Sequence, residues 1–243
     1  MHKILLIDNG SGYITNLETS IKEQANQLKK DKKIKDFHID RFSAKEVTQA
    51  ENYPENLNDY QTIISSGSSK GYKYANELHK HIIENTPDST NILGVCYGHQ
   101  QFAEALGAKV TNSGKMHHGE RDGTIKKDDP LLEGIHDNGK LRSYGRHQKY
   151  IKVGEEGPLE VLAESTSDKT NETFVEAYKK GNVYGVQFHP EKIDDHKKIF
   201  YNLMKDTPLE NKMAEPKHDT KIHQFKPKEE YKPQAEESDA KAA

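Results

Sequence analysis

The stretch GVCYGHQ, residues 94–100, contains Cys96, the only cysteine among 243 residues. It follows an apolar run and precedes a predicted helix, with Gly94 and Gly98 two residues to either side. A lone cysteine is most often a small buried hydrophobe. On a sharp strand-to-helix turn, however, glycines permit a strained backbone and the helix N-terminus favours the thiolate. The pattern therefore predicts a nucleophile at Cys96.

A thiol nucleophile needs a base, and the base needs a group that orients it. His189 in VQFHPE follows the last apolar strand-like run, and Glu191 comes two residues later. In an extended segment these two side chains face the same way, and Pro190 stiffens the backbone between them. The spacing fits a base and its orienter. Because the chain contains thirteen histidines, a surface strand end with a chance His-Pro-Glu sequence remains the alternative interpretation of this motif alone.

The first half of the chain alternates between predicted strands and helices, which must position these side chains. Continuous apolar runs predict buried strands, and apolar residues at helical spacing predict the helices between them. The predicted strands are residues 3–8, 37–42, 61–65 and 91–95, and the predicted helices lie around residues 14–28, 74–83 and 98–106. This alternation predicts an α/β fold with a mostly parallel sheet covered by helices on both faces.

The second half of the chain has a different rhythm. Residues 108–186 show short strand-like pieces with Gly and Asp turns, such as LEVLAES and ETFVEAY. We expect an added antiparallel portion, a last strand at residues 183–188 and a closing helix at residues 194–205. From about residue 207, prolines and mixed Lys, Glu and Ala follow no period. We therefore predict a domain over residues 1–206 and a disordered tail over residues 207–243.

Composition narrows the function classes. The net charge of −3 gives no basic surplus for nucleic acid or an anionic membrane. One cysteine excludes an internal disulfide and Cys-cluster metal sites, and favours a reducing compartment. The N-terminal apolar run closes at Asp8, too early for a signal-peptide core, and no run of about 20 apolar residues exists. We expect a cytoplasmic protein without a cofactor.

The histidines outside VQFHPE do not form a metal-binding pattern. His99, His117, His118 and His147 lack the helical H-x-x-x-H spacing of known ligand sets. The Gly-Ser turn at residues 65–71 lacks the G-K-[S/T] ending of a phosphate-binding loop, and NGSG is not a dinucleotide fingerprint. We expect no metal and no nucleotide at these positions.

Together, GVCYGHQ and GVQFHPE resemble the class I glutamine amidotransferases, the Cys-His-Glu glutaminase family. ILLIDNGSGY and MHHGE are similar to further segments of that family, so the resemblance covers about residues 3–205. It implies a flavodoxin-like fold, with Cys96 as nucleophile, His189 as base and Glu191 as its orienter. It also implies that Gln100, one helical turn past the nucleophile, helps to hold the substrate glutamine.

The implied reaction needs an oxyanion hole. Attack by a thiolate on the γ-carboxamide gives a tetrahedral oxyanion, then a γ-glutamyl thioester and ammonia, and the oxyanion needs preorganised N–H donors. The backbone N–H of Tyr97 is one candidate. The other should come from the turn after the third strand, which departs from the family's Ser-Gly-Gly-Pro because Gly67 is kept and Ser68 replaces the second glycine. We expect the N–H of Ser68 to be the second donor.

A second departure is RSYGRHQKY, residues 142–150, where the family has a short His-containing motif. His147 is the candidate match and therefore a candidate substrate-binding residue. We interpret the cations Arg142, Arg146 and Lys149 as a solvated strand edge.

The first functional hypothesis is a free-standing glutaminase subunit that hydrolyses L-glutamine and passes ammonia to a separate synthetase chain. No ATP site is recognisable, and the motifs lean toward the GMP synthase and anthranilate synthase types. The alternative is a stand-alone γ-glutamyl hydrolase or peptidase with the same triad, which Ser68 favours. A third hypothesis, a non-catalytic binding module, gives no reason for Cys96, His189 and Glu191 to coexist.

Overall fold

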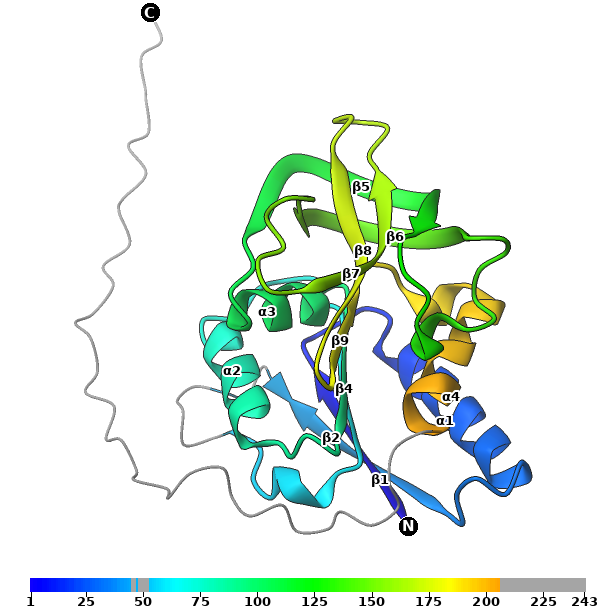
Figure 1. The fold of residues 1–243 in the computed structure, drawn as a ribbon. Coiled ribbons are helices and arrows are strands. Elements are labelled where there is room, and N and C mark those ends of the chain that lie inside the picture. The colour runs from blue at the N-terminus through cyan, green and yellow to red at the C-terminus, as the bar shows by residue number, and fades with distance from the viewer. Residues whose placement is uncertain (45–46, 48–52, 206–243) are drawn as a thin grey trace, which may run out of the picture.

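The computed structural model describes residues 1–44, 47 and 53–205, and this part of the chain forms one sheet of nine strands with α-helices on both faces (Figure 1). The first half contains β1 (His2–Asp8), α1 (Ile14–Lys30), β2 (Phe37–Ser43), β3 (Thr62–Ser65), α2 (Ala75–Asn85), β4 (Asn91–Val95) and α3 (Tyr97–Ala105). The second half contains β5 (Val110–Ile125), β6 (Lys140–Ile151), β7 (Glu160–Thr166), β8 (Thr173–Lys180), β9 (Val183–Val186) and α4 (Lys198–Lys205).

The strand order β2-β1-β3-β4-β9-β8-β7-β5-β6 joins a parallel half to an antiparallel half. Neighbours from β2 to β9 pair in parallel, and neighbours from β9 to β6 pair antiparallel. The predicted α/β, flavodoxin-like class with an added antiparallel portion is confirmed. The carboxyl ends of β1, β3, β4 and β9 meet at one edge, where α/β folds place their sites.

Strand β1 shows why its apolar run is continuous. Ile4 and Leu6 pack into the core layer that contains α1 and α4, whereas Leu5 and Ile7 pack into the layer with α2. Successive side chains of a strand point to opposite faces, so a strand covered on both faces must be apolar at every position. In Figure 1 the α1–α4 pair and the α2–α3 pair lie on opposite sides of the parallel strands.

The antiparallel half differs from its prediction in strand length. Val110–Ile125 and Lys140–Ile151 form long strands of 16 and 12 residues instead of short pieces. The two pair along most of their length, with an irregularity in register between Asn112 and His117. β6 is an edge strand, and much of both strands faces solvent. Their sequences are therefore polar and contain glycines, and they lack the apolar pattern that would have predicted long paired strands.

The C-terminal helix also starts later than predicted. A 3₁₀ turn at Asp194–Lys197 precedes α4, whose apolar face is buried against α1. The predicted tail at residues 207–243 lies outside the described residues. Within the described ranges, no helix is both long and apolar enough to cross a bilayer.

Candidate active site

Cys96 lies on the turn between β4 and α3, with φ 51° and ψ −96°. A non-glycine residue rarely adopts such angles, and the surrounding chain fixes them here. The Cys96 N–H donates to the carbonyl of Val186 at 2.8 Å. A Cβ on Gly94 would lie 2.5 Å from the Gly98 carbonyl carbon, and one on Gly98 would lie 2.5 Å from the Ser65 oxygen. The predicted elbow geometry is present, and both flanking glycines are required by close backbone approach.

His189 and Glu191 come from the segment that follows β9. His189 Nδ1 lies 2.8 Å from Glu191 Oε1, and both residues are buried. From the sequence we expect an extended segment here, whereas Pro190–Lys192 forms a 3₁₀ turn. The turn still brings the carboxylate onto the imidazole because His189 itself remains extended. The His189 ring also lies beside the Cys96 side chain, since both line one pocket and both adjoin Gly67.

The electrostatics of this group favour a protonated His189. Burial alone would lower the pKa of His189, but the Cys96 thiolate and the Glu191 carboxylate, by charge and hydrogen bonding, raise it to about 10. His189 therefore remains protonated at neutral pH when it faces the thiolate. A protonated imidazole beside a thiolate is prepared to donate a proton to a leaving amine.

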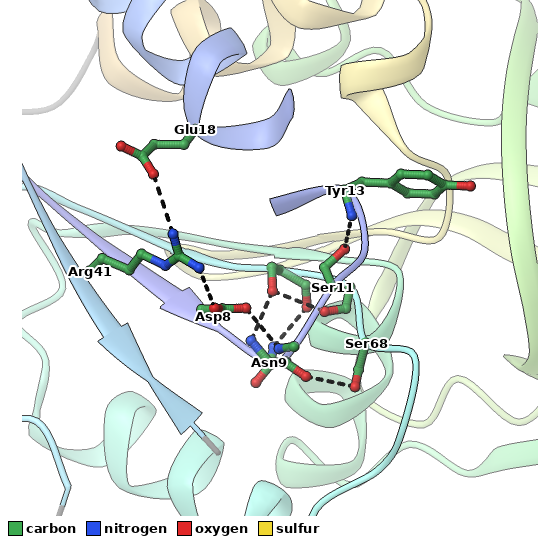
Figure 2. Close-up of polar contacts among 10 residues, drawn as sticks. Asp8, Asn9, Ser11, Tyr13, Glu18, Arg41 and Ser68 are labelled. Carbon is green, nitrogen blue, oxygen red and sulfur yellow. Dashed lines mark hydrogen bonds and ion pairs between the residues drawn. The ribbon is translucent and has the colours of Figure 1, made fainter. Parts of the chain in front are cut away.

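The loop after β3 approaches the same two side chains. A Cβ on Gly67 would lie 3.0 Å from His189 Cε1 and 3.6 Å from Cys96 Cβ, so glycine lets the backbone reach the thiol. The Ser68 hydroxyl donates to the Asn9 carbonyl at 2.7 Å (Figure 2). Tyr97 is the first residue of α3, so its N–H has no partner within the helix. The predicted oxyanion donors thus lie on two segments that flank Cys96.

The exit of β1 supports this loop (Figure 2). The side-chain amide of Asn9 donates to the carbonyl of Ser66 at 2.7 Å and to the Ser65 hydroxyl at 2.8 Å. Arg41 holds Asp8 by an ion pair of 2.6 Å. Sequence reasoning gave no role to Asn9. Its position at the carboxyl end of β1, on the same sheet edge as Cys96, was the available signal.

A pocket of about 290 Å³ opens over Cys96 and His189. Its walls come from the turns after β1, β3 and β4 and from residues 146–149 of β6. Among the described residues that line it, none is Asp or Glu, whereas Lys70, Arg146 and Lys149 are cationic. The predicted site residues Ser68, Tyr97, Gln100 and His147 all line this pocket, together with Cys96 and His189. The fold therefore brings them into one cavity.

Gln100 and His147 are tied to the wall of the pocket. The Gln100 amide donates to the Lys149 carbonyl at 2.8 Å. His147 Nδ1 lies 3.0 Å from the same carbonyl, and its Nε2 lies 2.9 Å from the Arg121 guanidinium. Because Arg121 can only donate, His147 must carry its proton on Nδ1. Both ring nitrogens are thus engaged within the protein, and His147 supports the wall instead of presenting a free nitrogen to a substrate.

Behind this wall lies a buried charge pair that sequence reasoning missed. Arg121 Nε lies 2.5 Å from Glu176 Oε1, and the Ser143 hydroxyl donates to the same oxygen at 3.0 Å. Burial, followed by the Arg121 charge, holds the pKa of His147 well below its usual value. Glu176 is fully buried within the run Phe174–Tyr178 of β8, whose other members are all apolar, so a charge inside a buried apolar run was the available signal.

Tyr13 and Arg146 also line the pocket, and Lys192 packs on the Tyr13 ring. The ring of Tyr13 meets the His189 ring edge-on with centroids 5.1 Å apart, and Lys192 Nζ lies 3.6 Å from the Tyr13 ring centroid. Hydrogen bonds from Tyr144 and Arg146 lower the pKa of the Tyr13 hydroxyl. Arg146 belongs to the predicted solvated edge and is exposed, yet its carbonyl also lies 3.7 Å from Cys96 Sγ. The edge interpretation is confirmed for β6, but Arg146 additionally lines the pocket.

A comparison with models of known families identifies the family of the chain. Residues 5–205 match the model of the glutamine amidotransferase class-I family. The chain belongs to this family.

Individual relatives of this class-I glutamine amidotransferase share limited identity with it. The chain is 24% identical over 207 residues to the bifunctional protein TrpGD of Thermotoga maritima, covering 84% of this chain but 32% of that protein. It is 31% identical over 157 residues to anthranilate synthase component 2 of Saccharolobus solfataricus, covering 62% of this chain and 77% of that protein. Relatives such as the bifunctional protein are thus much longer than the aligned region.

Solved structures of the family share the fold. A Thermoplasma acidophilum protein provisionally assigned as a subunit of GMP synthase superposes with a TM-score of 0.63 at 19% identity, covering 84% of this chain and 92% of that chain. The flavodoxin-like core and the antiparallel portion of this amidotransferase are therefore a family architecture.

Proposed function

We propose that this class-I amidotransferase hydrolyses L-glutamine to glutamate and ammonia through a γ-glutamyl thioester on Cys96. The observation that carries the proposal is the contact of Cys96 with His189 and of His189 with Glu191, inside a pocket at the carboxyl edge of the sheet. Cys96 is the nucleophile, His189 moves the proton, and Glu191 orients and charges His189. The N–H groups of Tyr97 and Ser68 are the proposed oxyanion donors, with Gly67 providing the close approach.

In the proposed reaction, a thioester forms on Cys96 and is then hydrolysed. Attack by the Cys96 thiolate on the γ-carbonyl forms the C–S bond, and collapse of the oxyanion breaks the C–N bond while His189 donates its proton to the leaving ammonia. Water then attacks the thioester carbonyl and gives one proton to His189, and the C–S bond breaks to return the Cys96 thiolate. Glutamate leaves, and the thiolate–imidazolium pair is restored.

We further propose that the ammonia passes to a separate synthetase chain. The names of relatives support this, since one is a numbered component of anthranilate synthase and another, from Sulfurisphaera tokodaii, is one subunit of a glutamine-hydrolysing GMP synthase. The matching region contains the glutaminase fold, so the acceptor of the ammonia would be bound by the partner.

The test combines ammonia release from L-glutamine with mass spectrometry of the acid-quenched protein. Because Cys96 is the only thiol in the chain, a γ-glutamyl adduct has one possible thioester position. We expect ammonia release and an adduct in the wild type, and neither in Cys96→Ala. Ammonia release that survives in a folded Cys96→Ala protein would overturn the proposal.

A further inference from the structure

Asn9, which follows β1, holds the loop after β3 through both its side chain and its backbone (Figure 2). Its side-chain amide uses both hydrogens, one on the Ser66 carbonyl at 2.7 Å and one on the Ser65 hydroxyl at 2.8 Å. Its backbone N–H donates to the Ser66 hydroxyl at 2.9 Å. All three residues are fully buried. Asn9 therefore fixes the backbone at Ser66, two residues before the proposed oxyanion donor Ser68.

The Ser66 hydroxyl transmits this constraint to the next peptide. It accepts from the Asn9 N–H and donates to the Gly67 carbonyl at 2.9 Å. The carbonyl and the N–H of a trans peptide point in opposite directions, and the described chain contains no cis peptide bond. Because the Gly67 oxygen is held on the Ser66 hydroxyl, the Ser68 N–H points away from that hydroxyl. Among the described hydrogen bonds, none uses this N–H, so it is available to an oxyanion.

A chain of hydrogen bonds continues from Asn9 to helix α2. His79 Nδ1 lies 2.6 Å from the Ala75 carbonyl, and its Nε2 lies 2.7 Å from the Ser65 hydroxyl. Burial lowers the pKa of His79 to about 4, so the ring is neutral at neutral pH. A carbonyl can only accept, so Nδ1 carries the single proton and Nε2 accepts from Ser65. The Ser65 oxygen is thereby left to accept from the Asn9 amide, and each bond of the chain has one direction.

We propose that Asn9, Ser66 and His79 are positioning residues of the oxyanion hole, which hold the Ser68 N–H in the direction that the tetrahedral intermediate needs. This inference rests on the proposed thioester chemistry at Cys96, whose two steps both pass through an oxyanion. None of the three residues lines the pocket, so their effect must reach the reaction through the loop. A misplaced donor weakens binding of the oxyanion more than binding of the neutral amide, so kcat should fall while KM changes little.

The first test uses Ser66→Ala and Asn9→Ala, which remove the two anchors without adding volume. We expect kcat for ammonia release from L-glutamine, per titrated Cys96, to fall about tenfold in each, less than the loss of a whole donor costs. KM should stay within about twofold of the wild type. Alkylation of Cys96 by iodoacetamide forms no oxyanion, so its rate should not change. General damage to the site would slow both reactions.

The remote end of the hydrogen-bond chain is tested at His79. His79→Leu removes the acceptor of the Ser65 hydroxyl, and we expect kcat to fall with KM and the alkylation rate unchanged. His79→Gln places an amide oxygen near the former Nε2 and should restore part of kcat. His81→Leu is the matched control, because His81 lies on the same helix and bonds to Asn85 within it. Equal kcat in His79→Leu and His81→Leu would overturn the role of His79.

Wild-type kcat in both Ser66→Ala and Asn9→Ala, or a kcat that falls only in parallel with alkylation, would overturn the inference. If Asn9→Ala does not fold, Ser66→Ala decides alone, because it keeps the side-chain bonds of Asn9.

Failure of the proposed function gives a different result, since the wild type would then release no ammonia from glutamine. Acylation of Cys96 by p-nitrophenyl acetate decides the inference in that case, because this ester also reacts through an oxyanion. A nitrophenol burst that slows in the two alanine variants relative to alkylation supports the positioning role. An unchanged ratio of the two rates overturns it.

Discussion

At the residue scale, the proposed site depends on one thiol, that of Cys96. Cys96 is buried at a positive φ, touches the His189 side chain, and lies at the first turn of α3. The turn presents the thiol to the pocket, beside the imidazole of His189. A buried cysteine without a base would be an inert core residue, so the contact with His189 is what distinguishes the two interpretations.

Removing the thiol should abolish turnover without unfolding the protein. In Cys96→Ala the alanine keeps the small volume, so the loss of packing is limited to one sulfur atom. We expect no detectable ammonia release and a melting temperature within a few degrees of the wild type, measured by circular dichroism. A variant that is folded and fully active would contradict the assignment of the nucleophile.

Glu191 and His189 should differ in both the size and the pH dependence of their effects. His189→Ala removes the proton carrier and should cost about 10²–10⁴-fold in kcat. Glu191→Gln keeps the imidazole and should cost less. Glu191→Gln removes a carboxylate that raises the pKa of His189. The alkaline fall in activity, which we expect near the His189 pKa of about 10 in the wild type, should therefore move to lower pH in this variant.

A pH profile of kcat/KM from pH 6 to 10.5 on both proteins tests the shift. The fold favours the protonated form of His189. Its contribution to the free energy of unfolding is therefore complete below the usual histidine pKa of 6.5 and is lost as the pH rises through about 10. A larger loss in Glu191→Gln than in His189→Ala, or an unchanged alkaline limb, would contradict the role of Glu191.

At the element scale, the β4–α3 elbow and the β6 wall determine where the side chains stand. The elbow depends on two glycines that let α3 begin directly against β3 and β4. The wall depends on the Lys149 carbonyl, which receives contacts from both Gln100 and His147.

Adding a methyl group to the elbow should destabilise it. The Cβ of Gly94→Ala would lie 2.5 Å from backbone atoms of Gly98 and His99, which can yield only by moving the helix. We expect a loss of about 1–3 kcal/mol in the free energy of unfolding by urea, with reduced alkylation of Cys96. Gly71→Ala is the control, because its Cβ would meet only the Tyr97 hydroxyl, at 3.6 Å. Equal stability of the two variants would mean that the elbow is not close-packed.

Removing one member of the Arg121–Glu176 pair should destabilise the protein more than replacing both members. Arg121→Met leaves the Glu176 carboxylate buried without its partner, at a cost of about 3–5 kcal/mol. Replacing both residues by methionine removes the uncompensated charge, so the double variant should be more stable than the single one. Urea unfolding of the two variants and of Glu176→Met completes the cycle. A double variant that loses the sum of the single losses would mean that the two residues act independently.

At the scale of the whole molecule, hydrogen bonds of Asn202 tie helix α4 to the antiparallel half. Asn202 of α4 donates its amide to the carbonyls of Leu131 and Glu133, in the connection between β5 and β6, at 3.1 and 2.9 Å. These bonds are buried or partly buried and tie the last described helix to the part of the fold that supplies the pocket wall.

Asn202→Ala should therefore weaken the attachment of the two halves. Loss of both bonds leaves two carbonyls unsatisfied, and we expect the free energy of unfolding to fall by about 1–3 kcal/mol. Asn85→Ala is the control, because Asn85 is exposed and its amide bonds only within α2. A similar small loss in both variants, measured by thermal unfolding, would show that the contact does not join the layers.

The sequence alone determined the class of the fold and predicted Cys96, His189 and Glu191 as the central residues of the site. Apolar periodicity showed alternating strands and helices because burial on both faces of a parallel sheet leaves a continuous apolar run. The lone Cys96 between two glycines, and the spacing of His189 and Glu191, were local signals. Both signals can be found in the sequence because a strand-to-helix turn and a short turn are each formed by neighbouring residues.

The tertiary structure alone decided which distant side chains share the pocket. Tyr13, Arg146 and His189 lie in three separate segments, and only the packing of the sheet edge brings them into one pocket. The engagement of both His147 nitrogens and the burial of Arg121 with Glu176 likewise depend on long strand pairings between β5, β6 and β8. Such contacts arise from register between segments far apart in the chain, and no periodicity within one segment records that register.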